Sequence, residues 1–171
     1  MARDSNYRQR VLMNKKETIY KVLLIVCFAV AMGFFEATVV VYLRAIMQKL
    51  PYITEPIQQV AEKLTKEPLY IVEQFREAAT IIMLIAFAVL TGKNLWERFA
   101  NFLLAFGVWD IVYYISLYII LRWPPSLFTE DVLFLIPVPW KGPVIAPVLV
   151  SILMIISAFV ILKRKVWEKE V

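Results

Sequence analysis

The feature that most constrains the fold of this chain is a set of four long apolar segments. They cover about residues 20–43, 71–90, 96–121 and 144–162, and few charges interrupt them. A run of roughly 18 or more apolar residues is long enough to cross the hydrocarbon core of a bilayer as an α-helix. The composition agrees, because 61% of the residues are hydrophobic, whereas roughly half is usual in a soluble domain. The sequence therefore predicts a single all-α membrane domain, an integral four-helix bundle.

Two scarce residue types restrict the chemistry. The sequence has no histidine, and Cys27 is its one cysteine. Histidine-ligated haem or zinc, nucleophiles activated by histidine and an intrachain disulfide are therefore excluded. Proton or metal chemistry must instead use carboxylates, tyrosine, lysine or arginine. A metal held by carboxylate and carbonyl oxygens would be a hard divalent cation such as Mg²⁺, Ca²⁺ or Mn²⁺.

Lysine and arginine are concentrated at one end of the predicted bundle. The N-terminal segment, the turn between the second and third spans and the C-terminal segment contain more of them than the longer connections at the other end. Because cytoplasmic loops are enriched in basic residues, both termini are predicted to be cytoplasmic. The net charge is +5, and the basic residues flank apolar spans. We therefore expect membrane lipids with anionic headgroups, and not nucleic acid, as the partners of this chain.

Two connecting segments are predicted on the outer side. Residues 55–67 carry apolar side chains at helical spacing, which is typical of an interfacial amphipathic helix on the membrane or on the protein's own outer face. Residues 123–142 are proline-rich, and the apolar stretch within them, 132–136, is too short to cross the bilayer. Thr129 followed by Glu130 and Asp131 indicates the start of a short helix there. We interpret this segment as a re-entrant or interfacial cap over the bundle.

Charged residues inside the predicted spans are the candidate functional groups. Each costs about 2.5–3.5 kcal/mol on insertion scales unless it is paired or faces water. At 1.5 Å per residue, Glu36 lies about 24 Å and Asp110 about 21 Å above the inner boundary, whereas Glu77 lies about 9 Å below the outer one. These three carboxylates are therefore predicted to converge in the outer half of the membrane, with Arg44 and Arg76 near the same level.

The candidate binding site includes these charges and the polar neighbours on their helix faces. Glu73, Arg76 and Glu77 share a face through i, i+3, i+4 spacing, and Gly33 allows another helix to approach close to Glu36. The candidate set consists of Glu36, Arg44, Glu73, Arg76, Glu77, Asp110, Tyr113 and Tyr114. Within it, Glu36, Glu77 and Asp110 are the candidate metal ligands. The alternative is a buried ion-pair network that only fixes helix register.

Three strings carry a resemblance to known proteins. They are REAATIIMLIAF at 76–87, ERFANFLLAFGVWDIVYY at 97–114 and WPPSLFTEDVLFLIPVPWKGPVIAPVLVS at 123–151. The chain resembles, from Glu36 onward, a family of small, uncharacterised prokaryotic membrane proteins with four spans. The resemblance implies a prokaryotic source, and hence the prokaryotic cytoplasmic membrane as its location. It implies no activity that can be transferred.

Three functions remain open from the sequence. The first is an outward-facing intramembrane site that binds a lipid headgroup or a cation. Whether that site is also catalytic stays open, because Ser126, Thr129 and Ser151 have no evident base partner. The second is an accessory or structural subunit of a larger membrane complex, or a like-chain oligomer. The third is passage of protons or cations through an oligomer, since carboxylates in spans are typical of proton relays.

Overall fold

The computed structural model describes residues 2–48 and 68–168, and it is mainly helical. Its elements are α1 (Ala2–Gln48), α3 (Pro68–Thr91), α4 (Leu95–Leu121), β1 (Glu130–Phe134), β2 (Trp140–Pro143) and α5 (Ile145–Glu168). Each helix contains a stretch long and apolar enough to cross a membrane: Lys16–Ile46, Tyr70–Thr91, Leu95–Leu121 and Ile145–Arg164. The predicted four-helix, all-α architecture is confirmed at this level. The predicted helix at 55–67 lies outside the described residues.

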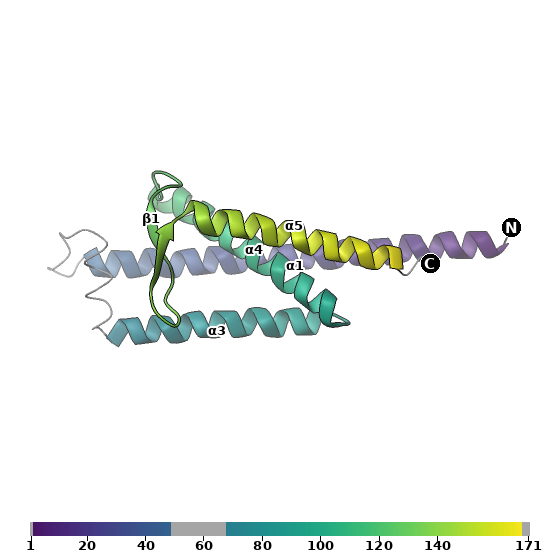
Figure 1. Cartoon of the computed structure of the whole chain (residues 1–171), viewed down its shortest axis with the longest axis horizontal. Helices are drawn as coiled ribbons and strands as arrows, with labels where there is room; N and C mark the ends of the chain where they lie inside the picture. The colour runs from purple at the N-terminus through teal and green to yellow at the C-terminus, as the bar shows by residue number, and fades with distance from the viewer. Residues whose placement is uncertain (1, 49–67, 169–171) are drawn as a thin grey trace.

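α1, α3 and α5 run side by side and α4 crosses them diagonally, so that the molecule has two distinct ends (Figure 1). One end contains the start of α1, the end of α5 and the turn between α3 and α4, and we call it the terminal end. The opposite end contains the two strands, and we call it the hairpin end. α1 continues beyond the other helices at the terminal end, because its helix includes the polar residues that precede the apolar stretch.

The proline-rich segment forms a β-hairpin, so the predicted short helix after Thr129 is wrong. β1 pairs antiparallel with β2, with Asp131 opposite Gly142 and Phe134 opposite Trp140. Val132, which is β-branched, and Phe134, which is aromatic, favour a strand. Prolines in the turn that follows lack the N–H groups a continuing helix needs. Figure 1 shows the hairpin extending across the hairpin end from α5 towards α3.

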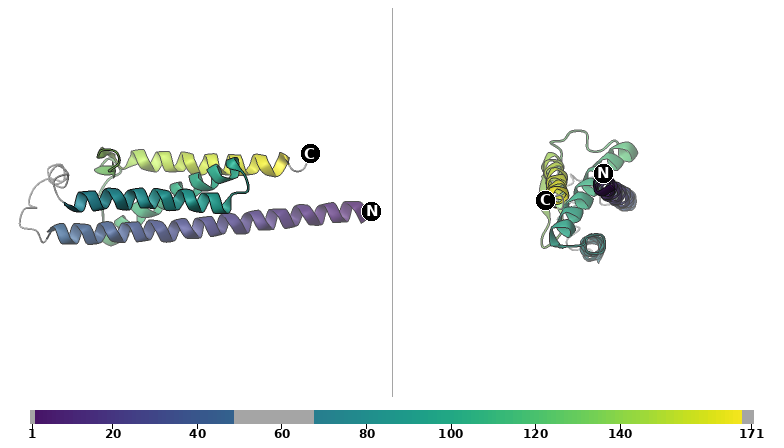
Figure 2. Two further views of the ribbon diagram at one scale, coloured as in Figure 1. Left: turned by 90° about the horizontal axis from the view of Figure 1, so that it is seen from below. Right: turned by 90° about the vertical axis from the view of Figure 1, so that its right-hand side faces the viewer.

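The helix α4 is the centre of the bundle. Viewed along the helices, it lies between α1 and α5, with α3 to one side (Figure 2). A Cβ atom on Gly33 would lie 2.6 Å from the Trp109 carbonyl oxygen, and one on Gly107 would lie 2.7 Å from the Ser151 carbonyl oxygen. Only glycine therefore permits these two close backbone approaches, as the sequence predicted for Gly33.

The core lies where these helices meet. It consists of Ile25, Ala29, Leu84, Ala100, Leu104, Ala105, Trp109 and Ala158. α3 packs against α4, and side chains connect it to α1. One such connection is the stacked ring pair Phe28–Phe87, whose centroids are 4.0 Å apart. Small residues in α1, α4 and α5 thus bring those helices together, whereas α3 is held more loosely.

The outer surface of the helices is apolar. Between 11% and 44% of the most apolar window of each helix is buried inside the protein. Large side chains such as Phe75 and Leu90 are 73% and 85% exposed. Water-soluble proteins rarely expose contiguous apolar patches larger than a few hundred Å². The surface therefore suits a hydrocarbon environment better than water.

We expect Gly107→Ala to lower the free energy of unfolding by about 1–3 kcal/mol, because the added methyl group forces α4 away from α5. The measurement is unfolding in detergent micelles by titration with sodium dodecyl sulfate. Gly142→Ala is the matched control, since its Cβ would meet only the flexible Leu133 side chain, at 3.2 Å. Equal stabilities of the two variants would contradict tight packing at Gly107.

Candidate functional site

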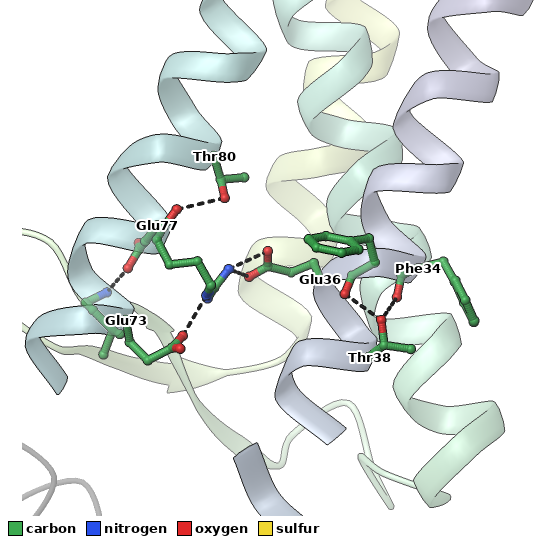
Figure 3. Close-up of polar contacts among 9 residues, drawn as sticks. Phe34, Glu36, Thr38, Glu73, Glu77 and Thr80 are labelled. Atoms are coloured by element: carbon green, nitrogen blue, oxygen red, sulfur yellow. Dashed lines mark hydrogen bonds and ion pairs between the residues drawn. The ribbon is translucent and has the colours of Figure 1, made fainter. Parts of the chain in front are cut away.

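Glu36 on α1 and Glu73 and Glu77 on α3 lie together near the hairpin end (Figure 3), and Arg76 on α3 forms ion pairs with the first two. Its Nη1 donates to both carboxylate oxygens of Glu36 on α1, at 2.6 Å each. Its Nε donates to Oε2 of Glu73, one turn earlier on α3, at 2.7 Å. Charge-assisted hydrogen bonds of this length are among the strongest polar contacts in proteins. Arg76 therefore bridges α1 and α3 and is engaged on two sides.

Glu77 follows Arg76 and is more deeply buried, with 8% of its surface exposed. Its Oε2 accepts a hydrogen bond from the backbone N–H of Leu135, in the turn of the hairpin, at 2.9 Å. Its Oε1 is buried and has no hydrogen-bond partner among the described residues. An unpartnered buried carboxylate oxygen is costly, because it has lost water and gained nothing in exchange.

The hairpin turn is held by two side chains of α3. Gln74 donates from Nε2 to the Leu135 carbonyl oxygen at 3.1 Å, while Glu77 accepts from the N–H of the same residue. Gln74 is absent from the residue set predicted from the sequence. Its i, i+3 spacing from Glu77 places both on one face of α3, which is the signal that identifies it. Both backbone polar groups of Leu135 are thus satisfied by α3.

The charges of this cluster do not balance. We define the Arg76 cluster as Glu36, Glu73, Arg76 and Glu77. It contains three carboxylates and one guanidinium. Arg76 forms ion pairs with Glu36 and Glu73, and Glu77 is the next residue in the sequence. When all four groups are ionised, the cluster has an excess of negative charge. Such an arrangement favours the arrival of a positive charge over that of an anion.

Asp110 lies on a different side of α4. Its Oδ2 accepts a hydrogen bond from the Ser151 hydroxyl on α5 at 2.8 Å, whereas Glu36 and Glu77 belong to the contacts of α3. Asp110 lies one turn after Gly107, which packs against α5. Both residues are therefore on the face of α4 that is turned towards α5. In the described part of the chain, no group of three carboxylate or cysteine residues is arranged to hold a metal ion.

The remaining candidates lie where α1 and α4 meet the hairpin. The Tyr114 hydroxyl donates to Oδ2 of Asp131 on β1 at 3.1 Å, and the Tyr113 ring packs edge-on against Tyr114. The guanidinium carbon of Arg44 lies 4.0 Å from the centroid of the Trp123 ring. Burial raises the pKa of the Asp131 carboxyl, and the charge of nearby Arg44 acts in the opposite direction. Asp131, which the sequence interpretation assigned to a helix start, thus belongs to this group.

No protein-family model, characterised protein or solved structure matches the chain. The site's own geometry must therefore support any functional conclusion.

We expect Arg76→Met to lower the free energy of unfolding by about 3 kcal/mol, since three carboxylates then lie together without a cation. This is the lower end of the range for a broken buried pair, because 26% of the Arg76 side chain remains exposed. Chemical unfolding in micelles, followed by tryptophan fluorescence, measures the change. Arg164→Met, at an exposed position of α5, is the control. A loss no larger than that of the control would argue against the bridge.

Proposed function

We propose that this chain is a multi-pass protein of the prokaryotic cytoplasmic membrane, with both termini cytoplasmic and the hairpin on the outer face. The exposed apolar surface of all four helices supports insertion. The basic residues support the orientation, because more of them lie near the terminal end of the candidate spans than near the hairpin end. Those near the terminal end are Lys16, Lys21, Lys93, Arg98, Lys163 and Arg164, and those near the hairpin end are Arg44, Arg76, Arg122 and Lys141.

We propose further that the Arg76 cluster binds a cation near the outer face. The observation that carries this proposal is Oε1 of Glu77, a buried carboxylate oxygen with no partner among the described residues, in a cluster with one guanidinium for three carboxylates. A bound positive charge removes the cost of that uncompensated negative charge. An anionic headgroup is less well supported at Arg76, because Glu36 and Glu73 already occupy its guanidinium.

The donor set favours a singly charged ligand. Hard divalent cations need six or more oxygen ligands in a regular arrangement, and among the described residues no three acidic side chains are placed so that they could hold one metal ion together. A proton, an alkali-metal ion or a primary ammonium group needs fewer partners. The proposed ligand is therefore monovalent, and binding needs no reaction. Aminophospholipid headgroups belong to this class, through their ammonium group.

A second candidate function is that of an accessory subunit in a larger membrane complex. The observation that favours it is the position of α3, which packs against α4 and reaches α1 through side-chain bridges. A helix held in this way presents a large apolar face, with Phe75 73% exposed. In this case the Arg76 cluster sets the register of α3. Purification in mild detergent distinguishes the two functions, since an accessory subunit co-purifies with other chains.

The orientation predicts a clear labelling pattern. We expect a single cysteine at position 126 to react with a membrane-impermeant maleimide in intact cells, and one at position 163 to react only after lysis. Both Ser126 and Lys163 are exposed, and Cys27→Ala supplies the cysteine-free background. The reverse pattern would show that the hairpin faces the cytoplasm.

The cation site predicts ligand-dependent stability. By mass action, a ligand at 100 times its Kd stabilises the folded protein by about 2.7 kcal/mol. We therefore expect the melting temperature of the wild type to rise with proton or alkali-cation concentration at constant ionic strength. Glu77→Gln should lose most of this dependence, because it removes the negative charge of the carboxylate and its ability to take up a proton. Glu97→Gln, which removes a carboxylate paired with Lys21 at the terminal end, should retain it. A wild-type melting temperature that does not change with either ion would refute the proposed site.

A further inference from the structure

Two arginines near the hairpin end, Arg44 and Arg76, are in opposite situations. Arg76 donates to two carboxylates. Arg44, by contrast, has no carboxylate within ion-pair distance among the residues that the structure describes. Its contact is with an aromatic face, because the guanidinium carbon lies 4.0 Å from the centroid of the Trp123 ring. A guanidinium that lies over an aromatic face uses none of its five N–H donors in that contact, so they stay available for hydrogen bonds.

The neighbours of Arg44 are already occupied. Asp131 is close enough for its carboxyl to experience the charge of Arg44, but it accepts its hydrogen bond from the Tyr114 hydroxyl instead. Trp123 is itself fixed by stacking near the Tyr114 ring, with centroids 6.5 Å apart. The Trp123 ring therefore orients the Arg44 guanidinium. No hydrogen bond within the described residues uses the N–H donors of Arg44.

The position along the helices is also informative. Arg44 lies just inside the end of the apolar stretch Lys16–Ile46, and Trp123 lies just beyond the end of Leu95–Leu121. In a bilayer, this is the level at which headgroups meet the hydrocarbon, and tryptophan and arginine commonly lie there. The anion that is most abundant at that level is the phosphate of a phospholipid.

We propose that Arg44, which lies over the Trp123 ring, binds a phosphate group, and that a phospholipid headgroup supplies it. The planar fork of a guanidinium matches two phosphate oxygens, which gives paired charge-assisted hydrogen bonds. This site differs from the cation site at the Arg76 cluster in its residues and in the sign of its ligand. Either site can therefore fail its test without affecting the other.

The test compares lipid retention by the purified full-length chain, measured by native mass spectrometry. The probes are phosphatidylglycerol and a diacylglycerol with the same acyl chains, which lacks the phosphate. We expect Arg44→Met to weaken phosphatidylglycerol binding about tenfold and to leave diacylglycerol binding unchanged. The matched control is Arg122→Met, because Arg122 is exposed at the same end and lies over Tyr118 at the longer distance of 5.8 Å.

Added inorganic phosphate distinguishes the two possible sources. Competition at millimolar concentration would assign the site to free phosphate, and retention of the lipid would assign it to a headgroup. Unchanged phosphatidylglycerol binding in Arg44→Met, or an equal loss in Arg122→Met, would overturn the proposal. If Arg44→Met does not fold, Trp123→Leu and Arg44→Lys test the same site. Each should bind the lipid more weakly than the wild type. Trp123→Leu loses the aromatic ring beneath Arg44, and Arg44→Lys loses the planar guanidinium that can donate two parallel hydrogen bonds.

Discussion

The arrangement of polar residues depends on two close backbone contacts of α4. Gly33 lets α1 approach the Trp109 carbonyl group, and Gly107 lets α4 approach the Ser151 carbonyl group of α5. Hydrocarbon provides no hydrophobic drive for helix association, so close packing of small residues is a principal source of affinity between spans. These contacts also set the rotation of α4. One face of α4 turns towards α1, and the face bearing Gly107 and Asp110 turns towards α5.

The position of α3 depends on polar side chains. Arg76 connects it to α1 through Glu36, while Gln74 and Glu77 connect it to the hairpin through Leu135. In a bilayer, such contacts would have little competition from water, although hydrogen bonds between membrane helices contribute only about 0.6 kcal/mol on average. A ligand that changes the charge of the cluster therefore acts on the contacts that hold α3. Structural and binding roles of the Arg76 cluster are thus compatible, and each affects the other.

The sequence predicts the position of each charged residue along its helix better than it predicts which neighbouring helix that residue faces. The apolar runs located the four helices, and i, i+3, i+4 spacing placed Glu73, Arg76 and Glu77 on one face. Counting the rise per residue along α4 also placed Asp110 near this level. That count does not say which side of α4 the residue lies on. The rotation of α4 is fixed by Gly107 against α5, a contact between residues distant in the sequence, and so Asp110 meets Ser151 instead.

The hairpin illustrates the same limit. Thr129, Glu130 and Asp131 have the local chemistry of a helix start, and only pairing with β2, across the turn, makes this segment a strand. Strand pairing is set by a partner and not by local propensity. The hydrogen bonds of Gln74 and Glu77 with the Leu135 backbone depend on that pairing, because they require the hairpin turn to reach α3. Gln74 could be identified from its helix face, but its partner could not.

The two proposed sites lie at one end of the molecule and have opposite electrostatic character. Screening by salt is weak where water is excluded. A cation at the Arg76 cluster makes the local potential less negative, which favours a phosphate at Arg44. Because such coupling is reciprocal, a phosphate at Arg44 favours the cation by the same factor. Occupation of both sites would therefore be cooperative, and the sign of that cooperativity follows from the charges alone.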